Sequence, residues 1–475
     1  MKKLLCFLLT MALLAGCTAA PMQTTDPPQT GGEVLIRLSD EGIEFPAGSG
    51  VRTSDAPDHT VVHITQPGTY RITGSIAAGQ IAVDLGEGAK NNPDATVLLI
   101  LDNAEIICRS APAVIFQNVW ESGAPNGLAG AHVLLAQGSK NRVAGGCTEE
   151  YDGAFYSRMS MKLDGSGSLR IEGGNEGLCS EMHLTIDGGD IFIESGNDGI
   201  NANADGESVI TINDGRLRIA VAGSTGEGDG IDSNGSVVIN GGHIEAYACA
   251  DSMDSGIDAD LGIRIKGGTV IATGNMLDPI DEDSQTHLVF SFAEPQKVPY
   301  FTLKDLYAST FLEAQTPCAF THLLFSSPKL TEGTYTLWSG ETQYEGISGT
   351  GGGFFGQLQP IERPEFPGHD DGRVEIPPQP TQPIVTHGTI QPPPEGDRPA
   401  DMPAVQIPQG GEGQMVILPV PPEGEDMPVP ELPEGVTPPQ EGFDRQPVQV
   451  ITGVLSTEFA VVEGANYFMN VRAVS

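Results

Sequence analysis

Asp198-Gly199-Ile200-Asn201 and Asp229-Gly230-Ile231-Asp232 are two copies of one short phrase, and the recurrence of this phrase decides the fold. The first positions of its five copies lie 22, 31, 26 and 23 residues apart, a period typical of stacked structural repeats. The other three copies are Glu176-Gly177-Leu178, Ser255-Gly256-Ile257-Asp258 and Asp278-Pro279-Ile280-Asp281. The region from Glu176 to Asp281 is therefore predicted to be a solenoid.

A second phrase runs in step with the first and consists of an alternating apolar strand closed by a glycine turn. Its copies begin at Leu184-Thr185-Ile186, Ile210-Thr211-Ile212, Val237-Val238-Ile239 and Ile263-Arg264-Ile265. Another apolar strand follows each turn, and no helical period interrupts the pattern. Such short units bury their apolar faces only by stacking. We therefore expect an all-β chain, a right-handed parallel β-helix (solenoid) with a small C-terminal β cap.

The N-terminus has the pattern of a secretory signal. Lys2-Lys3 precedes a largely apolar run from Leu4 to Leu14 that is too short to span a bilayer. Leu14-Ala15-Gly16-Cys17 resembles the lipobox of bacterial lipoproteins, which implies cleavage before Cys17 and attachment of lipid to its sulfur. The alternative is an ordinary signal with an incidental cysteine. We expect a lipoprotein on the extracellular face of the cell envelope that touches the membrane only through this anchor.

Composition divides the rest of the chain. Residues 18–32 are polar and contain proline, as a tether does, and residues 33–349 form the predicted β-helix domain, capped by the aromatic-rich 301–340. Residues 350–449 are rich in Pro, Gly and Glu and are predicted to be a disordered insertion. Residues 450–475 return to strand-like composition, and we expect them to complete the domain.

Charge and cysteine content exclude several functions. The 63 acidic and 24 basic residues give a net charge of −39, which repels nucleic acid and anionic membranes. Five cysteines remain beyond Cys6 and Cys17, an odd number without a CxxC pair, so their spacing predicts neither a zinc site nor a full disulfide framework, although one bridge stays possible. These are Cys108, Cys147, Cys179, Cys249 and Cys318.

The motifs together resemble a family of bacterial surface proteins described as carbohydrate-binding parallel β-helix domains. The resemblance covers about Glu33 to Gly346 together with Val450 to Val474. It is carried by the two Asp-Gly-Ile copies quoted first, the Gly-Gly turns, Gly68-Thr69-Tyr70 and Leu99-Ile100-Leu101-Asp102. The resemblance implies a pectate-lyase type of β-helix with calcium along the solenoid, and affinity for polygalacturonate or cellulose-like polymers, that is, binding more than catalysis.

Stacked acids also favour a cation on physical grounds. Equivalent carboxylates of adjacent coils would lie ~4.8 Å apart and repel by about 3 kcal/mol at an effective dielectric near 20. Calcium prefers such oxygen ligands. The predicted ligands are Asp198, Asn201, Asp229, Asp232, Asp254, Asp258, Asp278 and Asp281, and the weakened copy at Glu176 stands outside this set. The alternative is that Asp-Gly pairs simply form turns, because both residues tolerate the left-handed conformation.

These observations predict a surface-anchored, calcium-dependent, monomeric protein that binds a polysaccharide and is not an enzyme. Sugar rings would stack on exposed aromatic side chains, for which Trp120, Tyr151, Phe155 and Tyr156 are candidates unless they belong to the core. One alternative is a calcium-dependent polysaccharide lyase, whose base would be a lysine such as Lys162 or Lys266. The other is a scaffold or adhesin that presents the Pro-rich segment to a protein.

Overall fold

The computed structural model describes residues 32–125, 127–307, 309–349 and 455–474. These residues form 31 β-strands and one 3-10 helix, Ala89–Asn91, and include no α-helix. The all-β prediction is therefore confirmed for this part of the chain, where no helix is long and apolar enough to cross a membrane. The predicted signal with Cys17, nearly all of the tether and the whole insertion 350–449 lie outside the described residues.

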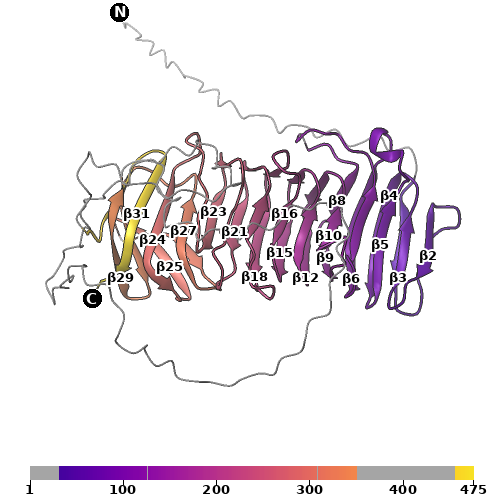
Figure 1. Ribbon diagram of the computed structural model, residues 1–475, viewed down its shortest axis with the longest axis horizontal. Helices are drawn as coiled ribbons and strands as arrows, with labels where there is room; N and C mark the ends of the chain where they lie inside the picture. The colour runs from indigo at the N-terminus through magenta and orange to yellow at the C-terminus, as the bar shows by residue number, and fades with distance from the viewer. Residues whose placement is uncertain (1–31, 126, 308, 350–454, 475) are drawn as a thin grey trace, which may run out of the picture. The chain divides into compact units, whose positions relative to one another are not determined.

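Three ladders of parallel strands make up the repeat region, and we call them ladders 1, 2 and 3 (Figure 1). Ladder 1 contains β4 (Gly68–Ile76), β6 (Val97–Cys108), β8 (Ala131–Leu135), β11 (Met161–Gly165), β14 (Leu184–Ile186), β17 (Val209–Ile212), β20 (Ser236–Ile239) and β22 (Ile263–Ile265). Ladder 2 runs from the C-terminal halves of β4 and β6 through β9 (Lys140–Gly145), β12 (Ser168–Gly173), β15 (Asp190–Ser195), β18 (Arg216–Val221), β21 (His243–Tyr247) and β23 (Thr269–Gly274).

Ladder 3 belongs to a separate sheet of eight strands. It contains β3 (Thr60–Ile64), β5 (Gly79–Asp84), β7 (Val114–Asn118), β10 (Gly153–Ser157), β13 (Glu176–Ser180), β16 (Ile200–Ala202) and β19 (Ile231–Ser233). Its first strand also pairs antiparallel with β2 (Val51–Asp55), while β1 (Val34–Leu38) pairs parallel with β4 of ladder 1. Each later period of the sequence thus contributes one strand to each ladder.

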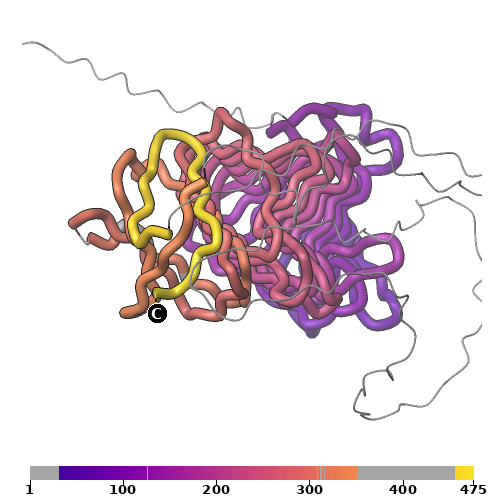
Figure 2. Tube along the Cα trace, turned by 60° about the vertical axis from the view of Figure 1, so that its left-hand side comes forward, coloured from indigo at the N-terminus to yellow at the C-terminus, as the bar shows by residue number. Residues whose placement is uncertain are grey.

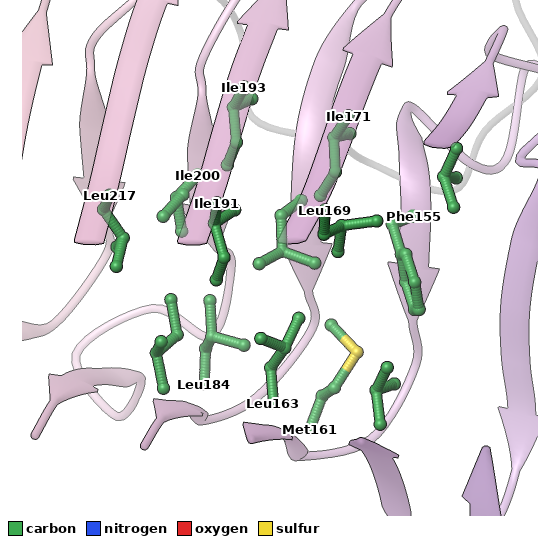
Figure 3. Close-up of a cluster of buried hydrophobic side chains, with 14 of the residues drawn as sticks. Phe155, Met161, Leu163, Leu169, Ile171, Leu184, Ile191, Ile193, Ile200 and Leu217 are labelled. Atoms are coloured by element: carbon green, nitrogen blue, oxygen red, sulfur yellow. The ribbon is translucent and has the colours of Figure 1, made fainter. Parts of the chain in front are cut away.

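The alternating apolar residues of the three ladders form one continuous core. Leu163 and Ile186 of ladder 1, Ile191 of ladder 2 and Ile200 of ladder 3 are each no more than 1% exposed. Figure 3 shows side chains from the three ladders converging between the strands. Because a strand turns alternate residues to opposite faces, the residues between these core positions point outward and are free for other roles.

Glycine serves two different purposes in the repeat. The second glycine of each Gly turn has a positive φ, as at Gly189 (101°) and Gly242 (86°), so these turns are as predicted. The glycine of the Asp-Gly-Ile phrase does not have a positive φ. Instead it lacks space: at Gly199 an added Cβ would lie 2.0 Å from Cγ2 of Ile219 and 2.6 Å from the carbonyl oxygen of Gly230. Close packing, and not a left-handed turn, therefore explains this glycine, which weakens the turn interpretation of the phrase.

The C-terminal part differs from the predicted uniform stack. The parallel ladders end at β22 and β23, and a mainly antiparallel assembly with its own aromatic core follows, joined to ladders 1 and 2 in one sheet of 23 strands. It contains β24 (His287–Gln296), β25 (Tyr300–Asp305), β26 (Thr310–Gln315), β27 (Phe320–Ser326), β28 (Gly333–Ser339), β29 (Thr342–Gly349), β30 (Phe459–Val461) and β31 (Ala465–Ala473). The cap is thus larger than 301–340, and the described strands do not form a single solenoid throughout.

The last strand joins this assembly across a long gap in sequence. β31 pairs parallel with β24 and antiparallel with β29, and Figure 2 shows it, in yellow, beside the orange segment that precedes the insertion. Aromatic rings pack between these strands. The ring centroid of Phe290 lies 5.2 Å from that of Phe468 and 5.3 Å from that of Phe459. The strand-like composition of residues 455–474 thus corresponds to real strands.

Candidate functional site

Two columns of polar side chains run along one edge of ladder 3, and both derive from the Asp-Gly-Ile phrase. In-register pairing of Leu178, Ile200 and Ile231, extended to Ile257 by a parallel bridge, aligns the copies. The residue two places before each of these forms the first column, which consists of Glu176, Asp198, Asp229 and Ser255. The residue after each forms the second column, which consists of Cys179, Asn201, Asp232 and Asp258. The predicted stacking of equivalent acids is therefore present for these copies.

The densest group of acids joins the two columns. One carboxylate oxygen from each of Asp229, Asp232 and Asp258 lies within 4.8 Å of the other two, and the three side chains are only partly buried. Backbone amides hold two carboxylates of the first column: the Ser255 N–H donates to Asp229 Oδ1 at 2.5 Å, and the Asp229 N–H donates to Asp198 Oδ1 at 2.7 Å. The spacing of the three clustered carboxylates suits one hard divalent cation. We call this group the Asp229 cluster.

The neighbouring coil contains buried oxygens without a hydrogen-bond partner. Asn201 Nδ2 donates to Glu176 Oε1 at 2.9 Å and to Asp198 Oδ2 at 3.2 Å. Asn201 Oδ1 and Glu176 Oε2 are buried and accept no hydrogen bond. Because buried polar atoms are nearly always satisfied, these two oxygens are acceptors available to a ligand. Carboxylates, an amide oxygen and backbone carbonyls are the donors that calcium takes, so the residues present fit this ion.

Burial and repulsion between these acids raise their pKa values. Burial raises the pKa of Asp198 to about 7, and burial with the charges of Asp152 and Asp198 raises the pKa of Glu176 to about 8. The pKa of Asp229 is also raised well above its ordinary value, by burial and by the charges of Asp258 and Asp198. Near neutral pH Asp198 and Glu176 therefore retain protons, at least in part, that a bound cation would displace.

Without divalent cations, we expect the melting temperature to fall by about 5 °C or more between pH 5 and pH 8. The ordinary pKa values of Asp and Glu are 3.8 and 4.5, so over this window the folded state retains protons on Asp198 and Glu176 that the unfolded state has released. Stability therefore decreases as pH rises through the folded pKa values. Melting in EDTA across this range measures the effect. A double variant, Glu176→Gln with Asp198→Asn, should flatten the curve, and a wild-type curve that is flat or rises would contradict the burial of these charges.

The other predicted ligands have different partners. Asp254 lies one place before Ser255 and accepts the Gly228 N–H at 2.5 Å and the Ser252 hydroxyl. Asp278 Oδ2 accepts the Ala259 N–H at 2.9 Å. Asp281 forms an ion pair with Arg264 at 2.6 Å.

The fifth copy thus does not continue the columns. Ile280 bridges to Ile263 of ladder 1, so the phrase at Asp278 has moved to another ladder. In this copy Pro279, which has no N–H, replaces the glycine of the phrase. Asp281 is instead neutralised by Arg264, a residue whose pairing with Asp281 the sequence did not predict.

Two further residues at this edge of ladder 3 escaped the sequence prediction. Asp152 lies just before β10, and its oxygen is within 4.8 Å of ligand atoms of Glu176 and Cys179. A signal was present, because Asp152-Gly153-Ala154 is a further copy of the acid-glycine-apolar phrase, with Gly153 aligned to Glu176. For Cys179, the only sequence signal for a role in the site was its place in the phrase, which matches the place of Asn201 and Asp232 in their copies.

A groove of about 750 Å³ crosses the outward face of ladder 2. One in-register row lies across it, formed by Glu105, Arg142, Arg170 and Phe192, and the same row continues beyond the groove to Arg218 and Glu245. The Arg170 guanidinium lies 4.7 Å from the centroid of the Phe192 ring, and Arg218 lies 5.9 Å from it on the next coil. The groove thus combines a partly exposed ring with a row of charged groups.

Ion pairs hold the charged groups of the groove in place. Arg142 binds Glu105 at 2.7 Å and Glu172 at 2.6 Å, and Arg170 binds Glu172 at 2.6 Å and also contacts Glu194. Hydrogen bonds from Arg142 lower the pKa of Glu172 to about 2, so the pair stays ionised at neutral pH. The arginines are therefore largely neutralised by the protein itself.

The aromatic residues named from the sequence do not line this groove. Phe155 is 0% exposed and Tyr156 is 2% exposed, so these two rings belong to the core, which the sequence had left open as the alternative to stacking on sugars. Trp120 and Tyr151 are partly buried, and Tyr151 packs against Tyr156 at 5.2 Å between ring centroids. Phe192 was missed because it lies inside a strand, where the sequence does not tell which residues face outward next to a hollow.

The residues that match known proteins include both the columns of ladder 3 and the groove of ladder 2. Residues 58–288 match a sequence family described as carbohydrate-binding domain-containing protein. A protein of that description from Acetivibrio thermocellus is 27% identical over 196 residues, covering 40% of this chain and 63% of that protein. The chain thus spans less than two thirds of the length of this relative. A solved polysaccharide lyase-like protein from C. thermocellum, a gadolinium derivative, is 21% identical with a TM-score of 0.39, over 50% of this chain and 90% of that chain.

Proposed function

We propose that this chain is a polysaccharide-binding protein, held at the cell surface through lipidated Cys17, whose binding region is a right-handed parallel β-helix stabilised by calcium. The match of residues 58–288 to a carbohydrate-binding family supports the class of ligand. The observation that carries the assignment to a site is the in-register row of arginines, glutamates and Phe192 across the groove of ladder 2.

The groove has the chemistry that a chain of sugar rings requires. Pyranose rings have an apolar face that packs on an aromatic ring, and their hydroxyls pair with fixed carboxylates and guanidinium groups. The ion pairs of Arg142 and Arg170 hold these groups in position before the ligand arrives, so little entropy is lost on binding. Because the arginines are already paired, the groove favours an uncharged, cellulose-like polymer over a polyanion.

Calcium gives a second route that suits an acidic polymer. Asp229, Asp232 and Asp258 are partly exposed, so an ion held by this cluster would have coordination positions open to solvent. Carboxylates of a pectin-like chain such as polygalacturonate would complete the shell and bridge two negatively charged partners. The residues that would hold the ion are those of the Asp229 cluster, supported by Asp198 and Asn201.

Phe192→Ala is expected to lower retention on insoluble cellulose about tenfold, because the loss of one stacking contact is worth ~1.4 kcal/mol. Sedimentation of the soluble form lacking residues 1–17, in calcium and in EDTA, measures this effect. Tyr307→Ala is the matched control, since this ring is 89% exposed and lies in the antiparallel assembly. An equal loss in both variants would remove the groove from the proposal.

The same experiment with insoluble polygalacturonate separates the two routes. Retention only in the presence of calcium, unchanged by Phe192→Ala, would support the calcium bridge as the binding mode. Retention on cellulose that persists in EDTA would support the groove. Failure to sediment with either polymer would contradict polysaccharide binding by this domain.

A calcium-dependent lyase remains the enzymatic alternative, and the surroundings of its candidate bases bear on it. Lys162 Nζ forms an ion pair with Asp187 at 2.8 Å on ladder 1, whereas the Asp229 cluster lies on ladder 3. Lys266 lies in the turn after β22, also on ladder 1. An assay for unsaturated uronate products with the wild type and with each lysine replaced would detect such activity.

A further inference from the structure

The N-terminal end of the two columns differs chemically from the Asp229 cluster. Oxygens of Asp152 and Glu176 and the sulfur of Cys179 lie within 4.8 Å of one another. Cys179 occupies the column position that Asn201, Asp232 and Asp258 occupy in later coils. The same geometry that presents only oxygen ligands in the later coils therefore presents a thiol here.

The surroundings of this group indicate a missing positive partner. Glu176 is 4% exposed, and its Oε2 atom accepts no hydrogen bond. The charges that act most strongly on Glu176 are those of Asp152 and Asp198, both acidic. A buried carboxylate among other acids is costly unless a cation compensates it.

The hydrogen bonds of Cys179 suit a metal-bound sulfur. The thiol is 3.9 Å from Asp152 Oδ1, to which it donates, and Asn203 Nδ2 donates to the sulfur at 3.6 Å. The amide would remain as a donor to a thiolate once the thiol proton is lost. Cys179 forms no disulfide, because all five described cysteines are free.

We propose that Asp152, Glu176 and Cys179 form a binding site for a thiophilic divalent cation of the zinc type, separate from the calcium ligands of the Asp229 cluster. Thiolate sulfur with carboxylate oxygen is a ligand set of zinc, whereas calcium takes oxygen alone. Binding forms one metal–sulfur bond and releases the thiol proton to solvent. The sequence had argued against zinc from cysteine spacing, but the ligands here come from different coils.

Cadmium is a suitable probe because a cadmium–thiolate bond produces an ultraviolet charge-transfer band. Titration of the full chain with cadmium should give this band with about one equivalent, and excess calcium should leave it in place. Cys179→Ser should abolish the band, and Asp152→Asn should weaken binding at least tenfold. Cys147→Ser, at an exposed cysteine, is the matched control and should retain the band.

The outcomes distinguish this site from a fortuitous one. Absence of a band in the wild type, or a band that survives Cys179→Ser, overturns the proposal. If Cys179→Ser does not fold, the comparison of Asp152→Asn with Cys147→Ser decides, because equal cadmium affinity in the two variants also overturns it. Displacement of the band by calcium would show that one hard-cation site extends along both columns, and the proposal of a separate site would fail.

Discussion

Replacing Asp229 and Asp258 together by asparagine is expected to lower calcium affinity at least ~100-fold and to remove the stabilisation that calcium gives. Two of the three carboxylates of the Asp229 cluster lose their charge, while the amide oxygen and the volume are retained. At a calcium concentration 100 times the dissociation constant, calcium raises the free energy of unfolding of the wild type by about 2.7 kcal/mol. The variant would lack this increase. Calorimetric titration and thermal melting with and without calcium measure both effects.

The same variant should be more stable than the wild type in EDTA near neutral pH. Carboxylates at this spacing repel by about 3 kcal/mol at an effective dielectric near 20, and the substitution removes that repulsion. Asp278→Asn is the matched control, because the structure places Asp278 outside the columns although its sequence copy predicted a ligand. Wild-type calcium binding by the double variant, or its loss in Asp278→Asn, would show that the ligands lie in the fifth copy instead.

Gly199→Ala is expected to destabilise the folded protein by about 3 kcal/mol. The new Cβ would lie 2.0 Å from Ile219 Cγ2 and 2.6 Å from the Gly230 carbonyl oxygen, so ladders 2 and 3 must separate locally. Overpacking of this kind typically costs 1–3 kcal/mol or more. Urea unfolding followed by circular dichroism gives the change in free energy of unfolding.

Gly88→Ala provides the comparison for this substitution. An added Cβ at Gly88 meets nothing within 4 Å, and its backbone φ of −74° suits any residue. This variant should unfold within ~0.5 kcal/mol of the wild type. If Gly199→Ala were equally harmless, the argument for close coil packing at this glycine would fail.

The strands and the acid columns were predictable because both depend on local periodicity. Alternating apolar residues at 184–186 and 210–212 became β14 and β17, and their equal spacing brought Ile186 into register with Ile212. The same register stacks Asp198 on Asp229. The sequence also predicted that Asp278 and Asp281 belong to the columns, and they do not. The phrase is present there, but the chain pairs with another ladder.

The binding groove and the thiol-containing group were not predictable for a different reason. Arg142, Arg170 and Phe192 come from three coils, and nothing in any one coil shows that they meet across a hollow. Asp152 and Cys179 are 27 residues apart and share a site only because β10 pairs with β13. Contacts of this kind depend on register between coils, which a motif search within one coil does not test.

The sequence by itself determined the all-β class, the period of the coils, the glycine turns and the recurrence of acids three residues apart, because each follows from local pattern and side-chain type. Tertiary structure alone decided which acids lie close together, that Arg264 neutralises Asp281, and that the glycines of the phrase are needed for space. It also decided that the chain ends in an antiparallel assembly with β31 beside β24. The physical reason is that pairing between distant segments is fixed by how all coils pack together, so it is specified jointly by residues that no local pattern connects.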